Sequence, residues 1–120
     1  MPKRKAEPSE QTVERARKRI AELQTELAAM DYVCSGALLK RMKTCGQPTC
    51  RCRRDPSARH GPYYEWGHMK GGKLVHRHVS AEQAILLRRA ITNYRQLRKL
   101  LLSWEKETER LMDAQAGRRP

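Results

Sequence analysis

The chain has 120 residues, of which 38% are apolar and only 5% aromatic, and it contains no Phe. This length and composition exclude several domains or a large hydrophobic core, so we expect a metal ion or a partner chain to help stabilise the fold. Lys and Arg number 26 against 13 Asp and Glu, a net charge of +13. The positive charge predicts a polyanionic partner, and nucleic acid is favoured over a membrane because no apolar run reaches the ~18 residues of a spanning helix.

Residues 1–8 begin with Met-Pro-Lys-Arg-Lys and are predicted to be a disordered basic arm. The arm lacks the apolar segment of a secretion signal, so we expect a bacterial cytoplasmic protein that could associate with the nucleoid. In that reducing compartment, clustered cysteines are more often metal ligands or redox groups than disulfides.

An amphipathic helix is predicted over residues 9–33. Its apolar residues are spaced by three and four positions, which is the heptad pattern of a coiled-coil seam. They are Val13, Ala16, Ile20, Leu23, Leu27 and Met30. The charged residues between them form the solvated face of such a helix.

Residues 34–79 are predicted to form a small three-stranded antiparallel sheet. Alternating residues indicate a first strand over 37–44, although this stretch would suit a helix equally well. The Tyr- and Trp-rich residues 62–68 indicate a second strand, and residues 74–79 a third. Between them, Lys-Gly-Gly-Lys at 70–73 is typical of a tight hairpin turn.

A long second helix is predicted over residues 80–114, before a basic tail at 115–120. Ser80 and Gln83 have the spacing of a capping box, which marks its start. Its predicted apolar stripe is Leu87, Ala90, Tyr94, Leu97, Leu101, Trp104, Thr108 and Leu111. Neither heptad helix can bury its stripe alone, so we expect the two to pair with each other, with a second copy of the chain, or both. The predicted class is α+β, a small sheet flanked by coiled-coil-like helices.

The loop between the first two predicted strands holds the densest cluster of reactive residues. Cys45, Cys50 and Cys52 offer three thiolates, and His60 follows at a Gly-Pro turn. Zn²⁺ prefers four tetrahedral sulfur and nitrogen ligands, so these four residues are the predicted zinc site. Cys34 or one of the other histidines is the alternative fourth ligand.

A closed site of three thiolates and one imidazole leaves no open coordination position, so the zinc would be structural and we expect no enzymatic activity. A disulfide between Cys50 and Cys52 would form a very tight ring, which argues against simple bridging. A thiol redox protein remains an alternative, and it predicts a reversible disulfide and no metal.

Basic residues surround this loop and continue onto the predicted hairpin. We expect phosphate contacts from Lys40, Arg41, Lys43, Arg51, Arg53, Arg54, Arg59, Lys70, Lys73 and Arg77. Tyr63, Tyr64 and Trp66 could stack on bases, although in so small a sheet such residues more often form the core. Glu65, the acid among these aromatics, is predicted to make a salt bridge on a strand face.

The motif around the cysteines resembles a known family. Residues 45–52 are Cys-Gly-Gln-Pro-Thr-Cys-Arg-Cys, and residues 60–64 are His-Gly-Pro-Tyr-Tyr. With the Gly-Lys at 72–73 and Asn-Tyr-Arg-Gln-Leu at 93–97, they are similar to a prokaryotic family of uncharacterised small proteins with the pattern CGKPxCxC…HGPYYY. The resemblance covers roughly residues 35–100 and departs from the pattern at Gln47 and Glu65. The family is associated with transposases and mobile elements, which implies a DNA-related role.

The sequence thus predicts a zinc-stabilised nucleic-acid-binding protein, with DNA favoured over RNA. It would serve as an accessory or regulatory factor in transposition, recombination or transcription. The main alternative is an assembly adaptor whose heptad helices bind a partner protein. We expect neither membrane contact nor a small-molecule substrate.

Overall fold

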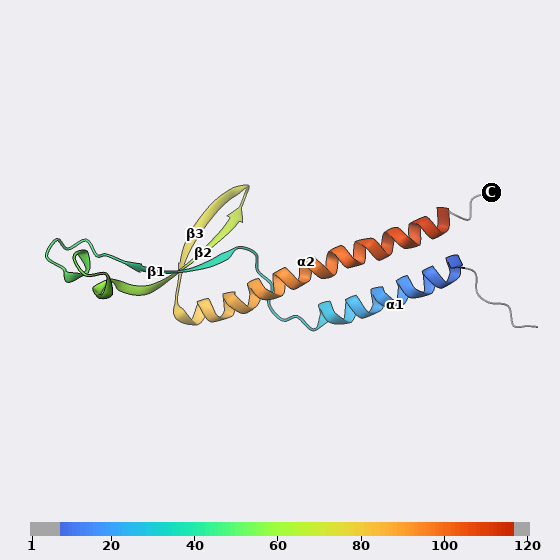
Figure 1. The fold of residues 1–120 in the computed structure, drawn as a ribbon, viewed down its shortest axis with the longest axis horizontal. Coiled ribbons are helices and arrows are strands. Elements are labelled where there is room, and N and C mark those ends of the chain that lie inside the picture. Colours follow the sequence, from blue (N-terminus) through green and yellow to red (C-terminus); the bar gives the residue numbers. More distant parts are fainter. Residues whose placement is uncertain (1–7, 117–120) are drawn as a thin grey trace, which may run out of the picture. The chain divides into compact units, whose positions relative to one another are not determined.

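The computed structural model describes residues 8–116. Residues 1–7 and 117–120, which hold most of the predicted basic arm and tail, lie outside the described residues. In chain order the elements are α1 (Pro8–Ala28), β1 (Ala37–Lys43), β2 (His60–Lys70), β3 (Lys73–Val79) and α2 (Ala81–Ala116) (Figure 1). Two 3-10 turns, Arg51–Arg53 and Pro56–Ala58, interrupt the loop between β1 and β2. The predicted α+β class is confirmed.

The chain forms two compact units. Residues 32–94 make up the first, which we call the sheet unit, and it contains the three strands and the start of α2. α1 and the part of α2 from Arg95 onward make up the second, which we call the helical unit.

The sheet is antiparallel throughout, in the order β1-β2-β3. In its middle, Trp66 of β2 lies opposite Leu38 of β1 and Arg77 of β3. The predicted hairpin between β2 and β3 is confirmed, with φ of 58° at Gly71 and 79° at Gly72. Two successive positive φ angles are the requirement of a type I′ turn, which glycine meets without strain.

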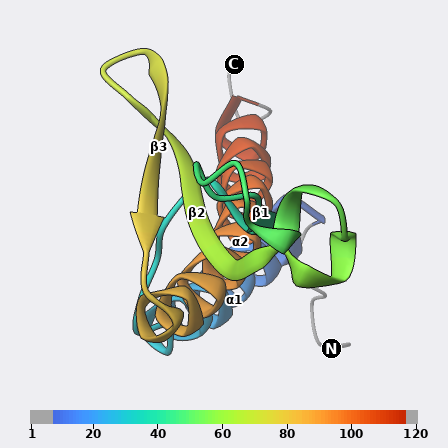
Figure 2. The ribbon, with the colours of Figure 1, turned by 90° about the vertical axis from the view of Figure 1, so that its left-hand side faces the viewer.

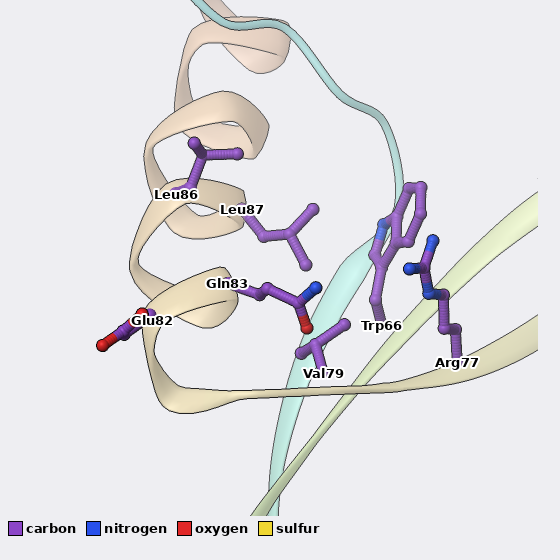
Figure 3. A pocket seen from close by; sticks show the side chains of 7 residues that line it. All are labelled: Trp66, Arg77, Val79, Glu82, Gln83, Leu86 and Leu87. Atoms are coloured by element: carbon purple, nitrogen blue, oxygen red, sulfur yellow. The ribbon is translucent and has the colours of Figure 1, made fainter.

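One face of the sheet packs against the start of α2 within the sheet unit. Figure 3 shows Trp66 and Val79 from the sheet and Leu87 from α2 pointing into the same space. Leu87 is only 8% exposed, and a groove of about 350 Å³ remains beside it. Trp66 also stacks on His68, with ring centroids 3.6 Å apart, and donates its Nε1–H to the Ser35 carbonyl at 2.9 Å.

The capping box at the start of α2 is confirmed. The Gln83 amide N–H donates to the Ser80 hydroxyl at 3.0 Å, and the Ser80 amide donates to the Gln83 side-chain oxygen at 2.8 Å. These two bonds satisfy donors that a helix start otherwise leaves unpaired.

In the helical unit, α1 lies beside the C-terminal part of α2 (Figures 1 and 2). The predicted α1 seam is confirmed, because Ala16 and Leu23 are completely buried and Val13 is half-buried. The helix ends at Ala28, earlier than predicted, since the Tyr32 carbonyl and Cys34 amide that follow are hydrogen-bonded to the Asn93 side chain and the Ala90 carbonyl of α2. Within residues 8–116, neither helix has a stretch apolar enough to cross a membrane.

The predicted single stripe along α2 is wrong in part. Leu101 is 44% exposed and Thr108 is also exposed, whereas Leu100 and Glu107 are buried. In the sheet unit the buried α2 residues are Ala84, Leu87, Ala90 and Ile91. A real helix has 3.6 residues per turn and drifts away from a strict heptad pattern. Moreover, α2 packs on the sheet in one unit and on α1 in the other, which a single period cannot describe.

We expect Leu87→Ala to lower the free energy of unfolding by about 2–4 kcal/mol, because it empties a buried site between sheet and helix. Urea unfolding followed by circular dichroism measures the change. Ile85→Ala, two positions away and 67% exposed, is the matched control and should have little effect. Equal losses for both variants would contradict the observed packing.

Candidate metal centre

The structure brings the four predicted ligands together. The Sγ atoms of Cys45, Cys50 and Cys52 and a ring nitrogen of His60 all lie within 4.8 Å of one another. In the described part of the chain, this is the one group of three or more cysteine, histidine or acidic side chains so placed. The prediction that Cys45, Cys50, Cys52 and His60 cluster is therefore confirmed.

Strand register and short turns place the ligands. His60 is the first residue of β2 and lies opposite Lys43 of β1, so it starts beside the end of β1, where Cys45 follows. The amide of Cys50 donates to the Gln47 carbonyl at 3.2 Å, which closes the turn between the first two cysteines. A 3-10 turn then carries Cys52 back toward Cys45.

Asp55 caps the 3-10 turn that leads from the loop into β2. Its Oδ1 accepts hydrogen bonds from the Ser57 amide at 2.9 Å and the Ser57 hydroxyl at 2.7 Å, while Arg51 donates to Oδ2 at 3.0 Å. Ser57 and then Arg51 keep the pKa of Asp55 below its ordinary value. The Asp-Pro-Ser sequence at 55–57 is a recognisable N-cap signal that could have predicted this role of Asp55.

Gly61 allows the close approach that positions His60. Its φ is 141°, and a Cβ at this position would lie 2.9 Å from the Arg41 carbonyl and 2.8 Å from Met42 Sδ. The β1–β2 register is irregular at this point, between Arg41 and Lys43. A side chain at residue 61 would therefore push the start of β2, and His60 with it, away from β1.

Two of the ligand separations are close to those around a tetrahedral ion. Cys45 Sγ and Cys52 Sγ are 3.7 Å apart, and Cys50 Sγ lies 3.3 Å from His60 Nε2. A zinc ion with bonds of about 2.3 Å to sulfur and about 2.1 Å to nitrogen would separate its ligand atoms by about 3.6–3.8 Å. The Cys45 amide also donates to Cys52 Sγ at 3.3 Å, the type of second contact that stabilises a bound thiolate.

The pKa values of the Cys50 and Cys52 thiols are shifted in opposite directions. The Cys52 backbone amide, then His60 and the other two thiols, lower the pKa of Cys50 to about 6. At Cys52 the Cys45 amide lowers the pKa, but burial and the neighbouring thiols outweigh it and the pKa is raised. A cation between the sulfurs would stabilise the Cys52 thiolate and so counteract the burial and the thiol contacts that raise its pKa.

The alternative fourth ligands lie elsewhere. The Cys34 thiol contacts the Ser35 carbonyl at 3.6 Å, and burial raises its pKa. His68 is stacked on Trp66, and His78 lies near Glu65 on the opposite face of the sheet. The structure thus places His60, and none of these residues, beside the three thiols.

The ten predicted phosphate-binding residues do not share one surface. Lys40 and Arg41 are neighbours in β1 and so project to opposite faces of the sheet. Arg77 lies on the face that packs against α2, and Lys70 and Lys73 face each other at the hairpin turn. Arg51 is paired with Asp55. The remaining residues are Lys43, which is paired with Glu65, and Arg53, Arg54 and Arg59, which are exposed.

Glu65 neutralises part of the positive charge on the sheet, as predicted. Its carboxylate lies 3.2 Å from Lys43 Nζ, 3.5 Å from Arg41 Nε and 3.7 Å from His78 Nε2. The side chain is only 12% exposed, and the hydrogen bond from Lys43 is the main reason that the pKa of Glu65 is lowered. The ion pairs with Glu65 therefore neutralise part of the charge of Arg41 and Lys43.

The three aromatic residues also have different surroundings. Tyr63 is 43% exposed, and Lys43 Nζ lies 5.9 Å from the centre of its ring. Trp66 and Tyr64 are half-buried, and one face of Trp66 is covered by His68. Trp66 thus has the packing role that was the alternative to base stacking, and Tyr63 is the most accessible ring of the three.

We expect the purified chain to contain one tightly bound metal ion, and Cys50→Ser to lose it and to unfold at a lower temperature, because one of four ligands is gone. Elemental analysis and thermal unfolding, with and without a chelator, measure both effects. Cys34→Ser is the matched control and should keep the metal. A metal-free protein with a reversible disulfide among Cys45, Cys50 and Cys52 would instead support the thiol redox alternative.

Glu65→Gln should lower stability at neutral pH, with the loss shrinking in acid. The folded-state pKa of Glu65 lies below its ordinary value of 4.5, so its ion pairs contribute above that pH and are lost as the pH falls through the folded-state pKa. Urea unfolding at several pH values measures the difference between the two proteins. The exposed α1 residue Glu26 provides the control, since Glu26→Gln should change stability little at any of these pH values.

Comparison with known proteins gives a family. The sequence model of a family described as a domain of unknown function, DUF6788, matches residues 10–89. The match spans α1, the sheet, the cysteine loop and the first turns of α2. No curated protein and no solved structure matches the chain. The chain belongs to the DUF6788 family.

Proposed function

We propose that this chain is a zinc-stabilised nucleic-acid-binding protein and that its partner is DNA. The observation that carries the proposal is the cysteine loop itself. In this loop a candidate metal cluster holds a segment whose exposed side chains include Arg53, Arg54 and Arg59.

The sulfur and nitrogen donors of the cluster favour zinc over other metal ions. Three thiolates and one imidazole suit Zn²⁺, whereas Mg²⁺ and Ca²⁺ require oxygen ligands. The four ligands would complete a tetrahedral shell, so the ion would stabilise the loop and would not activate a water molecule. Bound zinc would hold the loop in one conformation and fix the positions of its arginines.

Three loop arginines are exposed cations that a polyanion could reach. Arg53, Arg54 and Arg59 make no ion pair with any residue in the described range, unlike Arg51 with Asp55. Guanidinium groups bind phosphate oxygens in a bidentate way, and such contacts dominate sequence-independent affinity for DNA. The net charge of +13 would add long-range attraction.

The broader role rests on the motif. The resemblance of residues 45–64 to proteins associated with transposases supports an accessory or regulatory role in transposition, recombination or transcription. In such a role the protein would bind DNA beside the enzyme that acts on it, which agrees with the absence of an open coordination position in the proposed zinc shell.

Binding of fluorescent duplex DNA across a salt series tests the proposal. We expect affinity to fall steeply with salt, and the double variant Arg53→Glu/Arg54→Glu to weaken binding at least tenfold. Two lost phosphate contacts would lower the slope of log K against log [salt] by about 2.

The control is Arg17→Glu/Lys18→Glu, which makes the same change in net charge on exposed residues of α1. Equal weakening by both variants would show that net charge alone drives binding and would contradict a role for the loop. Failure of the wild-type chain to bind DNA at low salt would favour the adaptor alternative. Single-stranded DNA and RNA, measured in parallel, show which nucleic acid is preferred.

A further inference from the structure

A stripe on α2, within the helical unit, is only partly covered by the described residues. It consists of Leu97, Leu101, Trp104 and Thr108, spaced by four, three and four residues, and we call it the Leu101 stripe. Leu101 is 44% exposed, and Trp104 is half-buried. Leu101, Trp104 and Thr108, with Glu105 beside them, line a groove of about 400 Å³.

The Leu101 stripe differs from the surface that α1 covers. In the helical unit the buried α2 residues are Leu100, 4% exposed, and Glu107, 8% exposed. Leu101 and Thr108 each follow one of these by one position, which is about 100° around an α-helix. α2 therefore carries two neighbouring heptad stripes, and α1 occupies one of them.

The Leu101 stripe has the features of a helix–helix interface. Its heptad spacing is that of a coiled-coil seam, and a half-buried tryptophan at its centre is typical of an interface anchor. An amphipathic helix gains most of its stability by burying such a stripe against a partner. The Leu101 stripe is thus suited to a further helix.

The charged residues beside the stripe indicate that the partner helix is α2 of a second copy of the chain. Arg98 and Glu105 lie on the same edge, seven residues apart and opposite in sign, and neither forms an ion pair within the described residues. A two-fold interface must be complementary to itself. An antiparallel second copy brings this edge of both helices together and sets Arg98 of each chain against Glu105 of the other, whereas a parallel copy sets this edge against the opposite edge of its partner and forms no Arg98–Glu105 pair.

We propose that the helical unit forms a two-fold, antiparallel dimer in which the Leu101 stripes of two chains pack against each other. Trp104 lies near the centre of the interface, and the Arg98–Glu105 pair occurs twice at its edge. The proposal does not depend on DNA binding or on the metal. A dimer would carry two cysteine loops on one assembly.

Sedimentation of the full chain over a range of concentrations tests the proposal. We expect a monomer–dimer equilibrium, which Leu101→Glu shifts to monomer. Leu102→Glu is the matched control, since Leu102 is 57% exposed and lies off the stripe, and it should leave the dimer intact. Circular dichroism verifies that both variants remain helical. A wild-type chain that stays monomeric at all concentrations would overturn the proposal.

A charge swap tests the antiparallel orientation. Arg98→Glu and Glu105→Arg should each weaken the dimer about five- to tenfold, because each places like charges together twice. The double variant should restore wild-type affinity. A double variant that is as weak as the single ones, or single variants without effect, would overturn the antiparallel arrangement. Dimerisation that persists in Cys50→Ser would separate this result from the metal proposal.

Discussion

The constraint on which the cysteine loop depends is the meeting of three thiols and one imidazole at the junction of β1 and β2. Between these strands Cys52 is the one buried residue, so the loop has no hydrophobic core of its own. Its order comes from the strand register that sets His60 beside β1, from the Asp55 cap, and from the contacts among the sulfurs. A tetrahedral ion would join all of these contacts at one point.

This manner of holding the loop also shapes its surface. The loop has few buried side chains, and Arg53, Arg54 and Arg59 are all exposed. The sheet behaves differently, since Glu65 binds Arg41 and Lys43 and withdraws part of their charge. The ten predicted residues therefore differ in ion pairing: Arg41, Lys43 and Arg51 have acidic partners, whereas the exposed loop residues Arg53, Arg54 and Arg59 form no ion pair within the described residues.

The long helix serves both units. Its first turns bury Leu87 against the sheet, and its later turns bury Leu100 beside α1. A helix that packs on two different partners cannot keep one continuous buried stripe. Some apolar residues of the helix, Leu101 among them, are covered by neither partner and remain exposed.

The sequence by itself determined the order of the elements, the Gly71–Gly72 hairpin, the Ser80 cap and the ligand set of the candidate metal centre. Each of these depends on residues close together in the chain or on side-chain chemistry that only a few residue types possess. Only the tertiary structure decided that Glu65 neutralises two predicted phosphate ligands, that α1 ends at Ala28, and that Leu100 is buried in place of Leu101. These features depend on strand register and on which element packs against each helix face. The spacing of residues along the chain predicts neither.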